Sequence, residues 1–225
     1  MRDWAPALVA EAIGTFLFFF IAAGAVLVVT ADPPAADPAA GLLVVALAHG
    51  VVLAVLVSSL GAVSGGHFNP AVTLGLWVAG KIDAAKGLAY FVAQLVGGAA
   101  AGFALAWCFT DIGPAVPALG QGVDPVKGIA LEAIMTVVLL LAVFGTAVDR
   151  RGPKIGGLAI GLAVAADILF GGFLTGAAMN PARWFGPAVA AGDFINWYVW
   201  WIGPFLGAVV VALLYRFLFA PPPEG

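Results

Sequence analysis

Long apolar stretches recur along this chain, separated by short breaks that carry charged residues or proline. Six stretches, at residues 6–29, 42–60, 84–107, 128–148, 155–174 and 196–219, each approach the ~20 residues that a helix needs to cross the hydrocarbon core of a bilayer. The breaks include Asp32-Pro33-Pro34 and the segment from Asp149 to Lys154. The pattern predicts an all-α membrane protein with six transmembrane helices, followed by a disordered tail at residues 221–225.

Two further segments, Ser64–Gly80 and Leu174–Gly192, fit neither a full span nor an ordinary loop. Both are mostly apolar, and both are centred on the same tripeptide, as Asn69-Pro70-Ala71 and Asn180-Pro181-Ala182. Asn caps a helix N-terminus with its side-chain oxygen, and Pro is tolerated at the first helical position. A helix from Pro70 to Ala79 would be ~15 Å long, about half of the bilayer core. We therefore predict two re-entrant half-helices that enter from opposite sides and meet near the midplane.

The two halves of the chain repeat each other. The two asparagines lie 111 residues apart, and Gly50 and Gly161 each precede one of them by 19 residues. The pattern Glu-Ala-Ile-x-Thr that starts at Glu11 returns at Glu132. Each half holds three spans, an odd number, so the second copy is expected to be inverted relative to the first. We expect one transmembrane domain over residues 1–220, with repeats at about 6–107 and 128–219.

Composition excludes several classes of protein. Of the 225 residues, 63% are hydrophobic and only 9% are charged, and the mean hydropathy is +1.10. The core of a soluble protein of this size could not bury that much apolar surface. The net charge of −3 does not favour binding to the negatively charged backbone of a nucleic acid. The single cysteine, Cys108, cannot form an internal disulfide, and no Cys/His cluster has the spacing of a metal site. No metal or cofactor is expected.

The charges predict an orientation. With a cytoplasmic N-terminus, seven of the nine Lys and Arg residues would lie inside and only Lys127 and Arg183 outside, as the positive-inside rule requires. The seven are Arg2, Lys81, Lys86, Arg150, Arg151, Lys154 and Arg216. Both termini are therefore expected in the cytoplasm, with the protein in the plasma or inner membrane. The first span is not expected to be a signal peptide, because Glu11 interrupts it and a helical pattern follows at once.

The meeting point of the half-helices would favour neutral solutes. Each helix N-terminus presents about half a positive charge. If each Asn oxygen caps its own helix, its NH2 group should point into the cavity as a donor. A water or hydroxyl oxygen could accept from both, whereas a cation would meet two positive ends, so the site should also break a proton wire. Arg183 follows Asn180 where the helix dipole disfavours a cation, which indicates a functional residue. The alternative is an arginine that reaches the outer interface.

At this point a family resemblance emerges. The segments SGGHFNPAVTLG at 64–75 and LTGAAMNPARWFGPAV at 174–189, together with EAIGTF, EAIMT and WIGPFLG, resemble the aquaporin (major intrinsic protein) family over essentially the whole chain. The resemblance implies a homotetramer in membrane lipid, with one pore per subunit and a narrow aromatic/arginine constriction outside the asparagines. Carried over residue by residue, that constriction falls on His49, Ile168, Ala177 and Arg183.

This constriction departs from two family patterns. Strictly water-selective members place an aromatic first and a histidine second, and glycerol facilitators pair Trp and Phe with Gly. The facilitators also place Asp after the Arg, where this chain has Trp184. His followed by Ile and Ala is similar to plant vacuolar-type channels, some of which also admit ammonia, urea or glycerol.

The remaining polar residues are assigned mostly structural roles. Glu11 and Glu132 are expected to accept backbone N–H groups of the re-entrant segments, with a proton relay as the alternative. His67 is expected to hold its re-entrant segment or to line the inner vestibule. His49, in apolar surroundings, would be structural without the family match. Asp167 has no counterpart in the first half. It remains either an acceptor behind the constriction or a vestibule residue.

The function expected from these features is a passive channel for water that excludes protons and ions, with ammonia, urea and glycerol as candidate further solutes. One alternative is a glycerol or small-solute facilitator with little water selectivity. A secondary transporter also uses inverted repeats and broken helices, but it would need carboxylates around an ion site. A membrane scaffold is a third class, although the short loops leave little to engage a partner. An enzyme is not expected, because the chain carries no nucleophile–base pair.

Overall fold

The computed structural model describes residues 4–31, 34 and 36–219, so Arg2 and the tail predicted at 221–225 lie outside the described residues. Within them all regular structure is helical, and six helices are long and apolar enough to cross a membrane. These are α1 (Ala5–Thr30), α2 (Pro38–Ser64), α4 (Ala84–Cys108), α5 (Pro125–Val143) with the π-helical turn η2 (Phe144–Val148), α6 (Gly156–Thr175), and α8 (Val199–Leu214) with the π-helical turn η3 (Tyr215–Phe219). The predicted six-span, all-α fold is confirmed.

The helix ends differ from the predicted spans for local reasons. The second span was predicted to begin at residue 42, but α2 begins at Pro38 because the Asp37 side chain caps it, accepting the Ala39 N–H at 2.9 Å. The last span was predicted to begin at residue 196. Helix α8 begins instead at Val199, because Asn196 has a φ of 52°, a left-handed conformation that a right-handed helix cannot contain.

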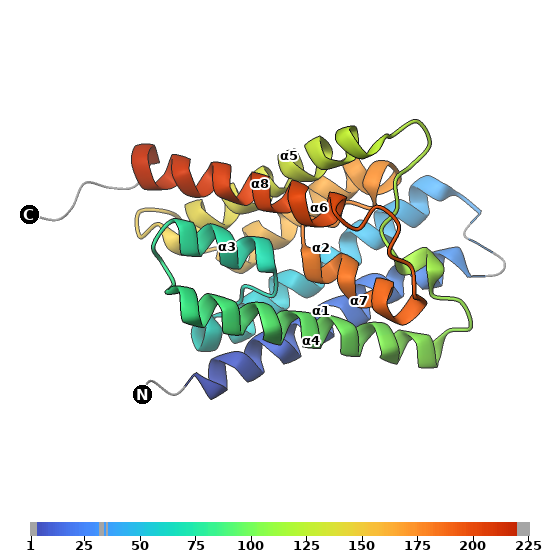
Figure 1. The fold of residues 1–225 in the computed structure, drawn as a ribbon, viewed down its shortest axis with the longest axis horizontal. Helices are drawn as coiled ribbons and strands as arrows, with labels where there is room; N and C mark the ends of the chain where they lie inside the picture. Colours follow the sequence, from blue (N-terminus) through green and yellow to red (C-terminus); the bar gives the residue numbers. More distant parts are fainter. Residues whose placement is uncertain (1–3, 32–33, 35, 220–225) are drawn as a thin grey trace, which may run out of the picture.

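Two short helices complete the bundle. Helix α3 (Pro70–Val78) has 9 residues and α7 (Pro181–Ala191) has 11, which correspond to about 14 Å and 17 Å. In Figure 1 the long helices run along the long axis, with α3 in one half of the molecule and α7 in the other. The chain enters α1 and leaves η3 at the same end of the bundle (Figure 1). The two predicted half-helices are thus present and approach from opposite ends.

The repeats pack against each other through equivalent glycines. A Cβ placed on Gly50 of α2 would lie 2.6 Å from the carbonyl oxygen of Gly161 on α6, and a Cβ on Gly161 would collide with the carbonyl of Gly50. Only glycine lets two helix backbones approach this closely. The crossing of α2 and α6 therefore brings the two copies of the duplicated sequence into direct contact.

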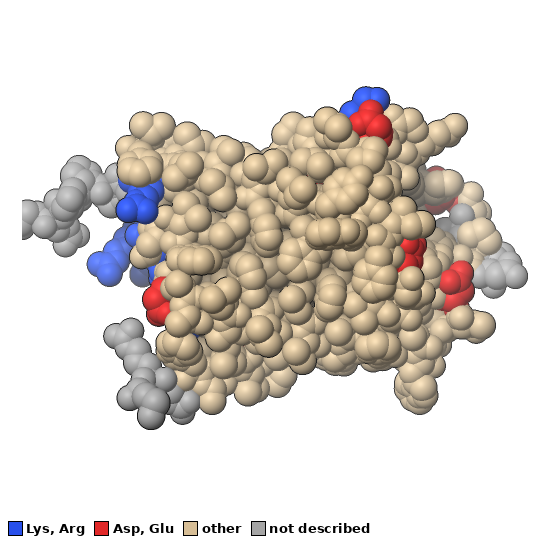
Figure 2. All heavy atoms as spheres, viewed as in Figure 1, with Lys and Arg blue, Asp and Glu red and all other residues tan. Residues whose placement is uncertain are grey.

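Charged side chains gather at the two ends of the bundle (Figure 2). We call the end where α1 begins and η3 ends the basic end. Among the described residues, six cations belong to helix ends and loops on this side: Lys81, Lys86, Arg150, Arg151, Lys154 and Arg216. The opposite end carries four aspartates, Asp37, Asp111, Asp124 and Asp193, with Lys127. On the face shown in Figure 2, the surface between the two ends is almost free of charge.

Candidate functional site

The two Asn-Pro-Ala tripeptides form the N-termini of α3 and α7. Asn69 precedes α3, and its Oδ1 accepts the N–H of Ala71 at 2.7 Å. Asn180 precedes α7, and its Oδ1 accepts the N–H of Ala182 at 3.0 Å. Proline occupies the first helical position in both cases, where its missing N–H costs nothing. All six residues of the tripeptides are buried, so both helices start inside the protein.

Each asparagine also bonds to the opposite half of the protein. Nδ2 of Asn69 donates to the carbonyl of Met179 at 3.0 Å, and Nδ2 of Asn180 donates to the carbonyl of Phe68 at 2.9 Å. Phe68 and Met179 have left-handed φ angles of 46° and 52°, uncommon for residues with a side chain. The expected free NH2 group is therefore half occupied. An amide carries two N–H groups, and one of each pair remains for a ligand in the cavity.

Glu11 accepts hydrogen bonds from the free donors of the first re-entrant segment. Its carboxylate accepts the backbone N–H groups of His67 at 2.9 Å and Phe68 at 2.7 Å. It also accepts the Ser64 hydroxyl at 2.7 Å and Nε2 of Gln94 at 2.8 Å. Non-helical backbone in a membrane must find such partners inside the protein. Four donors thus converge on one fully buried side chain.

Glu132 repeats this arrangement in the second half. Its carboxylate accepts the N–H groups of Ala178 at 3.0 Å and Met179 at 2.6 Å, and the hydroxyl of Thr175 at 2.6 Å. Thr175 is the repeat equivalent of Ser64, 111 residues earlier. These two hydroxyls were missed from the sequence, although the repeat itself could have revealed them. Glu11 and Glu132 hold the backbone behind the cavity and do not line it.

The hydroxyl of Thr73 determines which ring nitrogen of His67 carries the hydrogen. The Thr73 hydroxyl donates to the carbonyl of Asn69 at 3.0 Å, so its oxygen can only accept from the other two partners. These are Nε2 of Gln94 at 2.9 Å and Nδ1 of His67 at 3.0 Å. In neutral His67 the hydrogen therefore sits on Nδ1, and Nε2 is left as an acceptor. His67 thus contacts α3 through Thr73 and also lines the cavity.

A cavity of about 220 Å³ passes the asparagines. It is lined by Lys81 at the basic end, by Asn69 and Asn180 in the middle, and by His49 and Arg183 beyond them. Most of its remaining wall is apolar. A second hollow of about 520 Å³ opens on the other side of Arg183, so Arg183 belongs to the walls of both. The two hollows therefore adjoin at this arginine.

Arg183 is held by hydrogen bonds from two directions. Its Nη1 donates to the carbonyl of Ala115 at 2.9 Å, and its Nε donates to Nε2 of His49 at 3.3 Å. Nδ1 of His49 lies 2.8 Å from the carbonyl of Val45. A carbonyl only accepts, so Nδ1 carries the hydrogen and Nε2 is free to accept from Arg183. Ala115 ends the 3₁₀ turn η1 (Gly113–Ala115), in a break from which no site residue was predicted.

Ile168 and Ala177 flank this junction. Ile168 lines the hollow outside Arg183, and Ala177 lines the cavity on the asparagine side. Both are buried, and Ala177 has a φ of 44°. Trp184, which follows Arg183, stacks on Trp200 at a centroid distance of 5.8 Å and lines neither hollow. Arg183 thus shares the inner cavity with His49 and Ala177, and the outer hollow with Ile168.

Asp167 lines neither hollow. It is buried, and its Oδ2 has no hydrogen-bond partner among the described residues. Neither a lining position nor a hydrogen bond therefore favours one of its two predicted roles over the other.

Comparisons with known proteins place the chain in a family. The family model described as "Major intrinsic protein" matches residues 2–215. "Aquaporin TIP4-4" of Zea mays is 45% identical, covering 95% of this chain and 86% of its own. "Aquaporin TIP2-1" of Arabidopsis thaliana is 41% identical, covering 95% and 87%. The solved structure of the aquaglyceroporin from Plasmodium falciparum superposes with a TM-score of 0.80 at 24% identity, over 97% of this chain and 98% of its own, a likeness of fold.

Proposed function

This chain belongs to the major intrinsic protein family, and from that membership we infer that its solutes cross the bilayer through the cavity between α3 and α7. It is a passive channel for water and small solutes, and not an enzyme. The observation that carries our assignment of the pathway is the pair of reciprocal hydrogen bonds from Asn69 and Asn180. These bonds hold two helix N-termini together in the middle of one continuous cavity.

The remaining amide N–H groups would orient each passing water. A water that accepts from both asparagines must point its hydrogens away, towards the two ends of the pathway. Nε2 of His67, which can accept, lies on one of these sides. A chain of waters that reverses its orientation at the centre cannot pass a proton along, and the two helix N-termini repel cations. We therefore propose that the channel excludes protons and ions.

We assign selectivity to His49, Ile168, Ala177 and Arg183. A guanidinium has five N–H groups, and Arg183 uses two of them on His49 and Ala115. Three remain to orient a polar solute. His49 uses both ring nitrogens within the protein, so it serves as a wall and a support for Arg183. With an aliphatic side chain and a methyl group opposite, the bore has room for water, ammonia and urea.

Two alternatives are less well supported. A glycerol facilitator remains the second candidate, favoured by the small Ala177 and by the fold shared with an aquaglyceroporin. A coupled transporter would need free carboxylates for an ion. Glu11 and Glu132 instead accept four and three hydrogen bonds, and Asp167, whose Oδ2 has no partner among the described residues, lines neither hollow. We assign these two glutamates, with His67, the role of supporting the re-entrant segments.

We further propose an assembly and an orientation in the membrane for this chain, the assembly being the one that the family resemblance implies. The chain would form a homotetramer with one pore per subunit. The basic end would face the cytoplasm, because Lys and Arg are retained on that side during insertion. Both termini would then be cytoplasmic, and the membrane would be the plasma or inner membrane of the cell.

Stopped-flow volume changes of proteoliposomes test the proposed solutes. Vesicles with the purified chain and protein-free vesicles would be exposed to gradients of an impermeant osmolyte, glycerol, urea and ammonia. We expect fast water flux, measurable urea and ammonia flux, and slower glycerol flux, none of which saturates. Glycerol flux that keeps pace with water would favour the facilitator. Saturation, or dependence on an ion gradient, would favour the transporter.

A further inference from the structure

We propose that the hollow of about 520 Å³ outside Arg183, which we call the outer hollow, binds a small aromatic monocarboxylate that blocks the passage of water. The carboxylate would accept hydrogen bonds from Arg183, and the ring would fill the apolar part of the hollow. The block of water flux rests on the channel function proposed above. The binding site itself depends only on Arg183 and the wall around it.

Arg183 carries a buried charge without a carboxylate partner. Of the Lys and Arg residues in the described part of the chain it alone is buried, with an exposed fraction of 4%. Its hydrogen-bond partners are the uncharged His49 and the carbonyl of Ala115, and no carboxylate among the described residues lies within ion-pair distance. Glu132 attracts it only over a longer distance. Because an unpaired buried charge is costly, an anion that reached Arg183 would be stabilised there.

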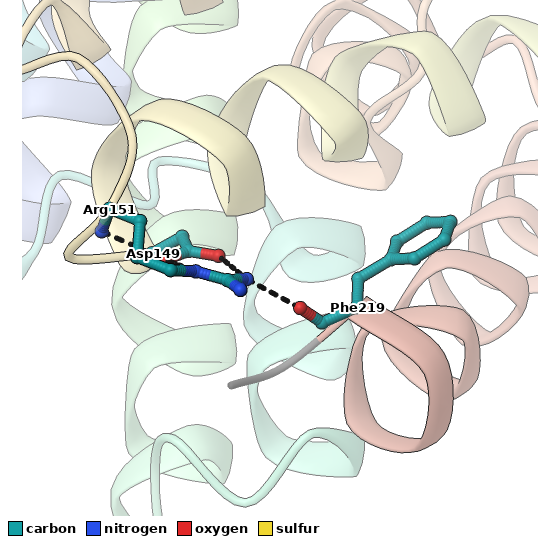
Figure 3. Close-up of polar contacts among 3 residues, drawn as sticks. All are labelled: Asp149, Arg151 and Phe219. Carbon is teal, nitrogen blue, oxygen red and sulfur yellow. Dashed lines mark hydrogen bonds and ion pairs between the residues drawn. The ribbon is translucent and has the colours of Figure 1, made fainter. Parts of the chain in front are cut away.

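Arg151 shows how this chain compensates an arginine elsewhere. At the basic end, Arg151 forms an ion pair with Asp149 at 2.6 Å and donates to the carbonyl of Phe219 at the end of η3 (Figure 3). Hydrogen bonds from Arg151 lower the pKa of the Asp149 carboxyl to about 2, so the pair stays ionised at neutral pH. Arg183 has a carbonyl partner as Arg151 does, but the carboxylate that would complete the set is missing from its described surroundings.

The unused N–H groups of Arg183 lie at the end of its guanidinium. Nε donates to His49, which lines only the inner cavity, whereas Nη1 donates to Ala115, which lines only the outer hollow. The terminal nitrogens are therefore on the outer side. One N–H of Nη1 and both of Nη2 have no partner in the described structure. Two neighbouring nitrogens of a guanidinium match the two oxygens of a carboxylate.

The outer hollow fits the apolar body of such an anion. Apart from Arg183, the exposed Thr30 carries the only polar side chain in its described wall. The rest is apolar, including Val26, Leu42 and Val116. A mostly apolar hollow with one set of charged donors is typical of a ligand site, and its volume lies in the usual range of about 300–1,000 Å³. A flat ring with one carboxylate matches both parts of this wall.

The surroundings permit an anion to enter and to block the pathway. Asp37 and Asp111 lie at the end opposite the basic end, but both are exposed and neither lines the hollow. Salt screens such exposed charges beyond about 10 Å. An aromatic ring is larger than the solutes proposed for the pore. Held at Arg183, it would fill the approach and occupy the N–H groups that orient a passing solute.

The first test measures water flux in proteoliposomes loaded with benzoate on both sides at neutral pH and constant ionic strength. Shrinkage in an impermeant osmolyte reports the flux. We expect a saturable loss of the channel-mediated flux as benzoate is raised. Benzamide, which has the same ring and no charge, should have no effect at the same concentrations. Acetate, which has the charge without the ring, should need about tenfold higher concentrations.

Charge at the rim of the hollow tests the site while Arg183 stays in place. Thr30→Lys should lower the benzoate concentration for half-inhibition by about twofold relative to Thr30→Gln, and Thr30→Glu should raise it by about twofold, because each charge acts across solvent. Lys154→Gln changes an exposed cation that lines neither hollow and should match wild type.

A binding measurement separates this site from the channel function. Isothermal titration of the purified full-length protein in detergent should show benzoate binding that Arg183→Val abolishes. Any water flux of Arg183→Val should also be insensitive to benzoate, as a fraction of its own flux. A chain that passes no water but binds benzoate in this way would refute the channel and support the site. Absence of binding, equal inhibition by benzamide, an active channel that ignores benzoate, or a block unaffected by charge at Thr30 would overturn the proposal.

Discussion

At the scale of single residues, the solutes that the pathway favours depend on which polar atoms have no hydrogen-bond partner within the protein. In Asn69 and Asn180, the side-chain oxygen accepts a hydrogen bond from the residue's own helix, and one amide N–H donates to the opposite re-entrant segment. One N–H donor therefore remains on each. Arg183 keeps three donors, and His49 keeps neither a donor nor an acceptor. The wall therefore offers fixed donors at two levels and little else, a pattern that suits small solutes with an accepting oxygen or nitrogen.

Replacing Arg183 tests its part in this pattern. Arg183→Val removes three free donors and a fixed charge while leaving both helix N-termini in place. We expect water flux to persist, larger neutral solutes to pass faster, and protons or small cations to begin to leak, because the outer electrostatic barrier is gone. Paired osmotic and pH-dye assays on proteoliposomes measure all three. A variant as selective as wild type would place the constriction elsewhere.

Replacing Glu132 tests the support of the re-entrant segment. Glu132→Gln turns one accepting oxygen into an NH2 group that faces backbone donors, which should cost about 1–3 kcal/mol. We expect a lower unfolding midpoint and a lower folding yield, with near-normal water flux per folded molecule. Asp193→Asn, which changes one exposed hydrogen bond at a helix end, serves as the control. Normal stability combined with abolished flux would instead give Glu132 a role in conduction.

At the scale of helices, periodic and repeated features were predictable and cross-chain contacts were not. The half-helices follow from Asn-Pro-Ala in an apolar context, because capping is a local property. The bond from Asn69 to Met179 could not be predicted, since it depends on backbone turned by left-handed residues such as Phe68. The same holds for Ala115, which binds Arg183 through a carbonyl that carries no sequence signal.

The crossing of α2 and α6 provides a test at this scale. Gly161→Ala would drive a methyl group into the carbonyl of Gly50 and should destabilise the protein by about 1–3 kcal/mol. Gly61→Ala, in the same helix as Gly50 but with nothing within 4 Å of the added methyl, should be neutral or stabilising, because alanine favours the helix. Thermal unfolding compares the two. Equal effects would show that the close approach of the backbones is unimportant.

The loop after η2 has a defined pH dependence. Because the pKa of Asp149 is lowered to about 2 from its usual value of about 3.9, its pairing stabilises the folded state at neutral pH. That contribution should be lost as the pH falls through about 2. We expect the difference in unfolding midpoint between wild type and Asp149→Asn to be constant from about pH 5 to 7 and to shrink below about pH 4. A difference that persists to the lowest pH would contradict the pairing.

At the scale of the whole molecule, an inverted duplication explains why one chain makes a passage with two similar halves. The repeat spacing and the apolar pattern were enough to predict six spans and two half-helices, because bilayer thickness limits helix length. They could not predict where the hollows lie, since these depend on how side chains from distant helices pack. The two hollows that adjoin at Arg183 are an example.

A pore formed by two half-helices should pass water and block protons. The most direct test is simultaneous recording of osmotic shrinkage and internal pH in proteoliposomes that hold a potassium-driven membrane potential. We expect water flux well above that of protein-free vesicles, with weak temperature dependence, and a proton flux equal to that of the empty vesicles. Proton flux that rises with the amount of protein, or water flux no faster than through lipid alone, would contradict it.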